Sequence, residues 1–417
     1  MEHIEEAVNK STKKAKKKTD GYNNQKWAIL SISSIPLVMT LGNSMLIPVL
    51  PAMENELSIT SFQVSMIITV YSIVAIFLIP IAGFLSDHIG RKKVIIPSLI
   101  IAGIGGIISG WAAWKMKDPY WLILVGRALQ GVGAAGASPI VMPLVGDMFK
   151  NDDEVSSSLG LIETSNTFGK VLSPILGALL AGFIWFLPFF SIPVFCLISI
   201  LLMLFLVKTP NKREKPIPVK QFFINIKKIF TDNGMWLYAI FAIGAILMFA
   251  LFGVLFFLSD TLEKTFEIKD IKKGFLLAVP LCALCASSYV TGKIIKENKV
   301  LMKRLTFSGC LLSAAAIFIL SFSEKLWFLI VMFLISGVGI GLALPCLDAL
   351  ITEGIEKAAR GTISSIYSSM RFIGVAAGPP AVAVLLKHSD HILFYLLSSL
   401  IFLAAIYTFF AIKPEKE

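Results

Sequence analysis

Charge is scarce in this sequence. Only 16% of its 417 residues are Asp, Glu, Lys or Arg, whereas 56% are hydrophobic, and it has just 4 histidines and 5 cysteines. It shows no nucleophile–base pair, no metal-ligand set, no phosphate loop and no sizeable soluble domain, which argues against a membrane enzyme or a receptor. The apolar residues also lack the regular alternation of an outer-membrane barrel. Cys282 and Cys285 form a CxxC inside an apolar run with no histidine near, so they are interpreted as packing residues and no metal site is predicted.

Long apolar runs are what the sequence does have. Each is about 18 to 24 residues long, enough to cross a bilayer as a helix. They predict an all-α membrane protein of twelve transmembrane helices, with both termini on one side because the number is even. The polar, lysine-rich start is interpreted as a tail rather than a removable signal peptide. The predicted spans are 27–51, 63–85, 94–114, 120–145, 157–181, 184–207, 235–258, 273–295, 301–321, 325–349, 362–386 and 391–412.

The basic residues orient the chain. The net charge is +11, and most of the 38 lysines and arginines fall on segments that are cytoplasmic if both termini are inside. This is the positive-inside pattern, and it predicts that both termini are cytoplasmic. A bacterial inner membrane is the expected location of this multi-pass protein. The basic tail and loops are therefore expected to contact anionic membrane lipids, and nucleic acid is not an expected partner.

The chain is expected to consist of two similar halves. A long polar interruption separates a six-helix bundle over 27–207 from a second one over 235–412, and the tails cover 1–26 and 413–417. The linker, 208–234, has either a short helix lying on the inner leaflet or no regular structure. "GVGAAGASP" (131–139) resembles "GVGIGLALP" (337–345), which indicates an internal duplication. Duplicated halves around a central site are typical of transporters that work by alternating access.

"GFLSDHIGRKK" (83–93) is the most charged turn between two apolar runs. Gly90 can end a helix in the left-handed conformation, and Gly83 allows a neighbouring helix to come close. Asp87 with Arg91 is interpreted as a conformational latch that holds the halves together on the cytoplasmic side in one state. The alternative is an ordinary turn whose cations, Lys92 among them, anchor the chain at the inner face.

Four ionisable residues lie clearly within predicted spans: Arg127, Glu163, Lys170 and Arg371. Such residues are costly in a membrane and indicate function. Glu163 is predicted to carry the coupled proton, with a permanent ion pair to Lys170 as the alternative. Asp348, toward a cytoplasmic helix end, is the second choice. The excess of embedded cations favours a neutral, anionic or amphipathic cargo.

The chain resembles the major facilitator superfamily, and within it the twelve-helix drug:proton antiporters. The turn at 83–93 resembles the family's loop 2–3 signature, and further resemblances run from 27 to 412: "LGNSMLIPVLP" (41–51), "GRALQGVGAAG" (126–136), "GKVLSPILGA" (169–178) and "GVAAGP" (374–379). The fifth-helix motif departs from the family pattern at Ser173 and Ala178. Asn43 stands where some relatives carry an acid, so no proton site is expected in the first helix.

The resemblance implies two bundles of six helices that rock around a central cavity, a proton gradient instead of a cofactor, and a monomer. It places Arg127 in a polar network that links protonation to the rearrangement. The flexing and packing positions that it implies are Gly131, Gly169, Ser173, Pro174, Gly177, Gly374, Gly378 and Pro379.

The expected function is proton-coupled efflux of hydrophobic or amphipathic small molecules such as drugs. Aromatic and methionine side chains suit variable greasy ligands, and the residues expected to line the cavity are Tyr71, Phe249, Phe252, Phe256, Tyr289, Tyr367 and Met370. A dedicated exporter of an endogenous metabolite, such as a siderophore or a lipid precursor, is the alternative. A proton-coupled nutrient symporter is a further one, against which the fifth-helix motif argues.

Overall fold

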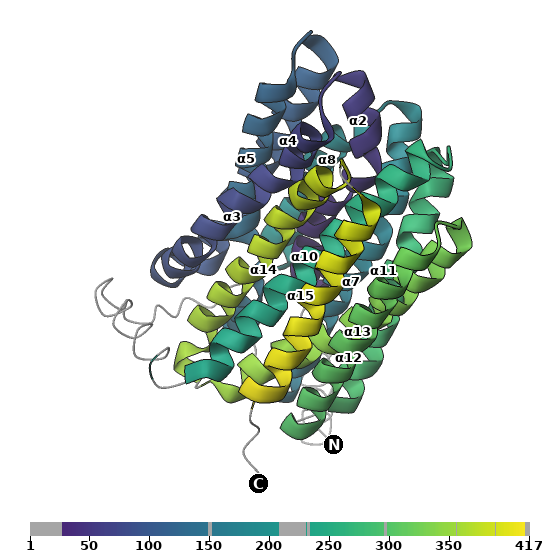
Figure 1. Ribbon diagram of the computed structural model, residues 1–417. Helices are drawn as coiled ribbons and strands as arrows, with labels where there is room; N and C mark the ends of the chain where they lie inside the picture. The colour runs from purple at the N-terminus through teal and green to yellow at the C-terminus, as the bar shows by residue number, and fades with distance from the viewer. Residues whose placement is uncertain are drawn as a thin grey trace, which may run out of the picture.

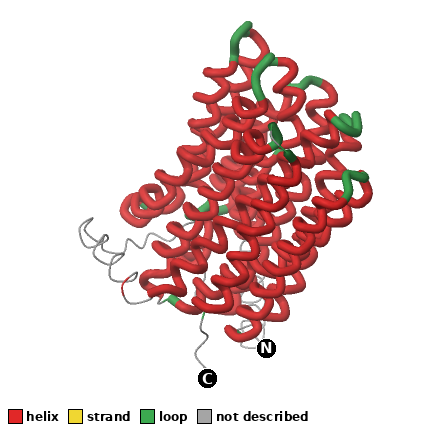
Figure 2. The backbone as a smooth tube through the Cα atoms, in the orientation of Figure 1, coloured by secondary structure: helices red, strands yellow, loops and turns green. Residues whose placement is uncertain are grey.

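The computed structural model describes residues 27–148, 152–207, 231, 234–295, 298–355, 357–387 and 389–412. The predicted tails and almost all of the linker 208–234, with its expected membrane-surface helix, lie outside the described residues. Within these ranges the chain folds into helices joined by short loops, with no strand (Figure 2). The all-α prediction is confirmed.

The first helix covers 27–44 and continues through η1 (Ile47–Val49) into α2 (Leu50–Glu56). The rest of the first half comprises α3 (Ser61–Ile89), α4 (Arg91–Lys115), α5 (Tyr120–Ala137), α6 (Val141–Met148), α7 (Asp152–Phe183) and α8 (Leu187–Leu206). The second half comprises α10 (Gly234–Lys264), α11 (Asp270–Ile295), α12 (Lys299–Ile319), η2 (Leu320–Phe322), α13 (Leu326–Gly354), α14 (Lys357–Leu385) and α15 (Asp390–Ala411).

The described residues contain 11 segments that are long and apolar enough to cross a membrane, with Trp27–Glu56 and Tyr120–Met148 each counted as one. The remaining long helix is α7, which has 32 residues and carries both Glu163 and Lys170. With α7 included, the segments match the twelve predicted spans to within a few residues at most ends.

Two predicted spans are broken rather than continuous. The first span stops being an α-helix after residue 44 and passes through a short 3-10 turn at Pro48 before α2 begins. The fourth span is interrupted between Ala137 and Val141, around Pro139. Proline lacks the amide hydrogen that a helix needs, and it pushes the preceding residue away from helical geometry.

The helices pack as two groups, one before the linker and one after it. In the first group α4 packs against α5 and α8, and α3 packs against α5; in the second, α10 packs against α14 and α12 against α13. Two long helix pairs join the groups: α3 runs along α14, and α7 runs along α11 (Figure 1). η1 and α2 also contact α10, and η1 contacts α11.

Glycines at matching positions make matching contacts in the two groups. A Cβ on Gly131 of α5 would collide with the carbonyl oxygen of Tyr71 in α3, and a Cβ on Gly337 of α13 would collide with that of Pro280 in α11. Both glycines therefore let two backbones approach closely at equivalent places. The contacts repeat as the duplicated sequence motifs do.

Candidate functional site

Arg127 of α5 is fully buried and satisfied entirely within the first half. Its Nε donates to the carbonyl of Ile67 at 2.8 Å, Nη1 donates to the carbonyl of Gly42 at 3.0 Å, and Nη2 donates to Asn43 Oδ1 at 2.8 Å. Nη1 also donates to Gln130 Oε1, and the guanidinium lies 4.6 Å from the centre of the Tyr71 ring. The fork geometry of arginine thus joins three helical segments.

Glu163 of α7 is held by a short polar chain. Asn166 Nδ2 donates to Glu163 Oε1 at 3.3 Å, and Thr40 Oγ1 donates to Asn166 Oδ1 at 2.6 Å. Thr40 lies on the first helix, one turn from Gly42 and Asn43, which accept from Arg127. The first helix therefore connects the surroundings of Glu163 with those of Arg127.

Four of the predicted charged residues form one cluster between the halves. Arg371 of α14 donates to Asp348 of α13 with 3.2 Å between Nη1 and Oδ1. Lys170 of α7 interacts electrostatically with Arg371, Glu163 and Asp348. We call these four residues the charge cluster. It contains two cations and two carboxylates. With Arg127, whose acceptors are carbonyl and amide oxygens, the embedded cations still outnumber the carboxylates, so the expectation of a neutral, anionic or amphipathic cargo stays a prediction.

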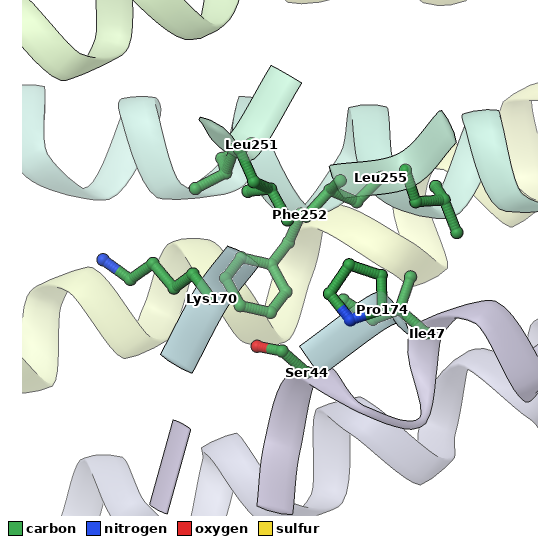
Figure 3. A pocket seen from close by; sticks show the side chains of 9 residues that line it. Ser44, Ile47, Lys170, Pro174, Leu251, Phe252 and Leu255 are labelled. Atoms are coloured by element: carbon green, nitrogen blue, oxygen red, sulfur yellow. The ribbon is translucent and has the colours of Figure 1, made fainter. Parts of the chain in front are cut away.

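A narrow pocket lies next to the cluster. Its cavity volume is only about 10 Å³, far below that of a small-molecule site, so the pocket is nearly closed in this structure. Both halves line it: the first contributes Ser44, Ile47, Lys170 and Pro174, and the second contributes Leu251, Phe252, Leu255, Leu277 and Leu281. Lys170 brings the pocket's one charged group, and its ammonium end points away from Pro174 and Ile47 (Figure 3). A mostly apolar pocket shared by two halves suits an amphipathic ligand.

The comparisons with known proteins agree with this geometry. The family model described as the Major Facilitator Superfamily matches residues 32–379 and 303–417. The chain belongs to the Major Facilitator Superfamily. It is therefore a membrane transporter and not an enzyme.

Relatives within the superfamily cover nearly the whole chain. It is 56% identical over 390 residues to the bacillibactin exporter of Bacillus subtilis (strain 168). The aligned residues cover 93% of this chain and 97% of the exporter. This chain is 24% identical over 377 residues to the class C tetracycline resistance protein of Escherichia coli, covering 86% and 89%.

Solved structures share the fold. The unoccupied, inward-facing bacterial homolog of the human lysosomal transporter Spinster superposes with a TM-score of 0.74 at 16% identity, covering 94% of this chain and 99% of that one. The human organic anion transporter MFSD10 superposes with a TM-score of 0.73, also at 16% identity, covering 92% and 99%.

In this structure the loop signature of the superfamily makes its ion pairs within the first half. Arg91 pairs with Asp87 and lies 3.1 Å from Asp147 on α6. Gly90 has the left-handed φ of 103° expected at this turn, and Lys92 donates to the carbonyl of Val207 at 2.8 Å, at the end of α8. Gly83, the first residue of the signature, faces the other half, since a Cβ there would lie 3.4 Å from Ser365 Oγ on α14. The latch stays a prediction about another conformation.

The superfamily's glycine motifs lie where helices of one half touch. Cβ atoms on Gly177 and Gly374 would collide with the carbonyl oxygens of Met45 and Ala245, and one on Gly378 would lie 2.7 Å from the carbonyl oxygen of Phe249. Gly169 lies against Leu37 and Thr40. Ser173 is buried and donates to the carbonyl of Gly169 at 2.6 Å, while Pro174 and Pro379 lie inside helices.

The aromatic side chains predicted to line the cavity are spread more widely. Phe252 lines the pocket. Tyr71 packs beside Arg127, Tyr367 is buried with its ring 5.6 Å from the Arg371 guanidinium, and Phe256 is buried. Phe249 and Met370 are half-buried against the core, and Tyr289 is 55% exposed.

Sequence reasoning did not single out Lys273, the first residue of the predicted span 273–295. It is 1% exposed, forms an ion pair with Glu263 and donates to the other half. Its place at the start of an apolar run, directly before Gly274, was the available signal, because a glycine there allows another helix to come close.

Proposed function

We propose that the chain exports bacillibactin or a closely related siderophore from the cytoplasm in exchange for protons. The observation that carries the proposal is the 56% identity to a bacillibactin exporter, spread over 93% of the chain. The lining of the pocket supports it, because a large amphipathic molecule needs both apolar surface and polar anchors, and Ser44 and Lys170 supply the latter. The pocket's narrowness means that cargo enters only after the halves move apart.

The charge cluster is the proposed proton-coupling site. Glu163 belongs to one half and Asp348 to the other, and both interact with the cations Lys170 and Arg371. A proton taken up by either carboxylate changes the charge balance between the halves at the level of the pocket. Because charges interact strongly in a low-dielectric interior, that change can favour one arrangement of the halves over another. Glu163 is the proposed carrier.

The proposed location is the bacterial inner membrane, with both termini in the cytoplasm and the transporter acting as a monomer in contact with lipids. The end of the bundle that contains α2 is then the outer end, and the end where α15 stops is the cytoplasmic one (Figure 1).

Purified protein in liposomes tests this function. When a pH gradient is imposed, labelled bacillibactin is expected to move in the direction opposite to the flow of protons. This movement is expected to stop when the gradient is collapsed. Glu163→Gln in the same vesicles is expected to abolish the response to the gradient. Bacillibactin movement that is indifferent to the gradient would contradict proton exchange.

Broad drug efflux is the second candidate function, favoured by the similarity to a tetracycline resistance protein. Tetracycline and a hydrophobic cationic dye, tested in the same vesicles, distinguish the two functions. Transport of these compounds without transport of bacillibactin would replace the first candidate by the second.

A further inference from the structure

The polar contacts that join the two halves gather at one end of the molecule. Among the described residues, four hydrogen-bonded pairs cross from one half to the other: Thr69 with Ala376, Ser259 with Ile47, Lys264 with Glu54, and Lys273 with Pro48. Three of them involve the segment 47–56. This segment begins at the pocket residue Ile47 and follows the pocket residue Ser44 in the chain. α2 marks this end in Figure 1.

Two of these contacts use carbonyl groups that proline releases. In an α-helix each carbonyl accepts from the amide four residues later, and proline has no such amide. Pro51 has no amide hydrogen for the Ile47 carbonyl, which instead accepts from the Leu50 amide within the 3-10 turn and from Ser259 Oγ at 2.8 Å. Pro380 likewise has none for Ala376, whose carbonyl accepts from Thr69 Oγ1 at 2.8 Å.

Lys273 makes the strongest of these contacts. Its Nζ lies 2.7 Å from the carbonyl oxygen of Pro48 in the other half and 2.7 Å from Glu263 Oε2 in its own half. The Lys273 side chain is 2% exposed and that of Glu263 is 11% exposed. A charged donor forms stronger hydrogen bonds than a neutral one, and more so where water is excluded. Glu263 therefore fixes the ammonium group, and Lys273 reaches across.

We propose that Lys273, positioned by Glu263 and assisted by Ser259, closes an outer gate by holding the Pro48 turn of the first half against α10 and α11 of the second. For the pocket to open toward this end, the turn has to leave Lys273, which stays with Glu263. The ion pair is thus a permanent feature of the second half, and the bond to Pro48 is the part that forms and breaks. The gate is the outer one because the proposed function places both termini in the cytoplasm.

Side-specific labelling of a cysteine beneath the gate tests the proposal. Ser44→Cys places the reporter in the pocket, in a background carrying Cys282→Ser and Cys285→Ser; Cys196, Cys310 and Cys346 are buried. A membrane-impermeant maleimide is added to right-side-out vesicles, and the labelling rate is measured.

Lys273→Met with Glu263→Gln removes the cross-half donor without leaving a lone buried charge. It is expected to raise the labelling rate about tenfold or more, as the loss of a bond from a charged donor implies. Ser259→Ala, which changes no charge, is expected to give a smaller rise. Lys273→Arg, with Glu263 unchanged, keeps a charged donor and is expected to label as slowly as the protein with Lys273.

Lys264→Met is the matched control. Lys264 also pairs across the halves, with Glu54 at 3.1 Å, and within its own half with Asp260 at 2.8 Å, but its side chain is 40% exposed. Because water reaches its ammonium group more easily than that of Lys273, its cross-half bond is expected to be weaker, and the labelling rate is expected to rise by less than in the Lys273/Glu263 variant.

Unchanged labelling in both the Lys273/Glu263 variant and Ser259→Ala, with normal amounts of protein in the membrane, would overturn the gate. So would an equal rise in Lys264→Met. The assay needs neither cargo nor a proton gradient, so its failure is distinguishable from failure of the transport proposal.

Discussion

Replacing Arg127 by lysine tests whether the buried guanidinium acts through its shape or only through its charge. Arg127 donates from three different nitrogens to four acceptors on three segments: Ile67 on α3, Gln130 on α5, and Gly42 and Asn43 on the first helix. Lysine keeps the positive charge but ends in a single nitrogen. One nitrogen cannot occupy the positions of three.

The size of the effect follows from that geometry. At least two of the four contacts are lost in Arg127→Lys, because the acceptors lie around different nitrogens. A hydrogen bond to a charged group contributes about 1.5–3 kcal/mol, so two give about 3–6 kcal/mol. At about 2–4 °C per kcal/mol for a unit of 150–250 residues, the unfolding midpoint falls by roughly 6 °C or more.

Thermal unfolding of the purified protein in one detergent measures this shift. Arg304→Lys is the control, since Arg304 is exposed on α12 and the same substitution there is expected to leave the midpoint unchanged. A midpoint for Arg127→Lys equal to that of the control would refute the idea that the fork of Arg127 ties the first helix to α3 and α5.

Three further substitutions test other parts of the structure. Asp87→Asn is expected to abolish efflux from cells while the amount of protein in the membrane stays normal, and unimpaired efflux would exclude the latch. Glu163→Gln is expected to remove the dependence of transport on the pH gradient in liposomes; full dependence would exclude Glu163 as the carrier. Gly177→Ala is expected to destabilise the protein by about 1–3 kcal/mol in thermal unfolding, because the added Cβ meets the Met45 backbone. Gly160→Ala in the same helix meets nothing within 4 Å and should not destabilise; equal midpoints would contradict the packing argument.

Most of the helical framework was predictable from the length of the apolar runs, because a helix must satisfy its own backbone in a membrane. The breaks were not predicted. Prolines occur inside α3, α4, α7 and α13 without ending them, yet Pro48 and Pro139 lie at interruptions. Whether a proline bends or breaks a helix depends on which neighbouring groups bind the freed carbonyls, and those neighbours come from distant parts of the chain.

The charged residues were predictable one at a time but not as a set. Glu163, Lys170 and Arg371 stood out because each interrupts an apolar run, whereas Asp348 was given second place. Its pairing with Arg371 joins α13 and α14, and no spacing within either helix reveals it. Lys273 was not singled out for the same reason: it is buried against Pro48, which lies far away in sequence.

The duplicated halves share their packing but not their charges, and this difference bears on how the transporter works. Tyr71 and Pro280 face the equivalent glycines Gly131 and Gly337. Two helical turns before each of them stand Val64, buried and apolar, and Lys273, buried and charged. In this structure the Asp87–Arg91 signature makes its ion pairs within the first half, whereas Lys273 joins the two halves at the end that contains α2. Weakening the bond from Lys273 to Pro48 should therefore shift the balance between the two openings toward that end.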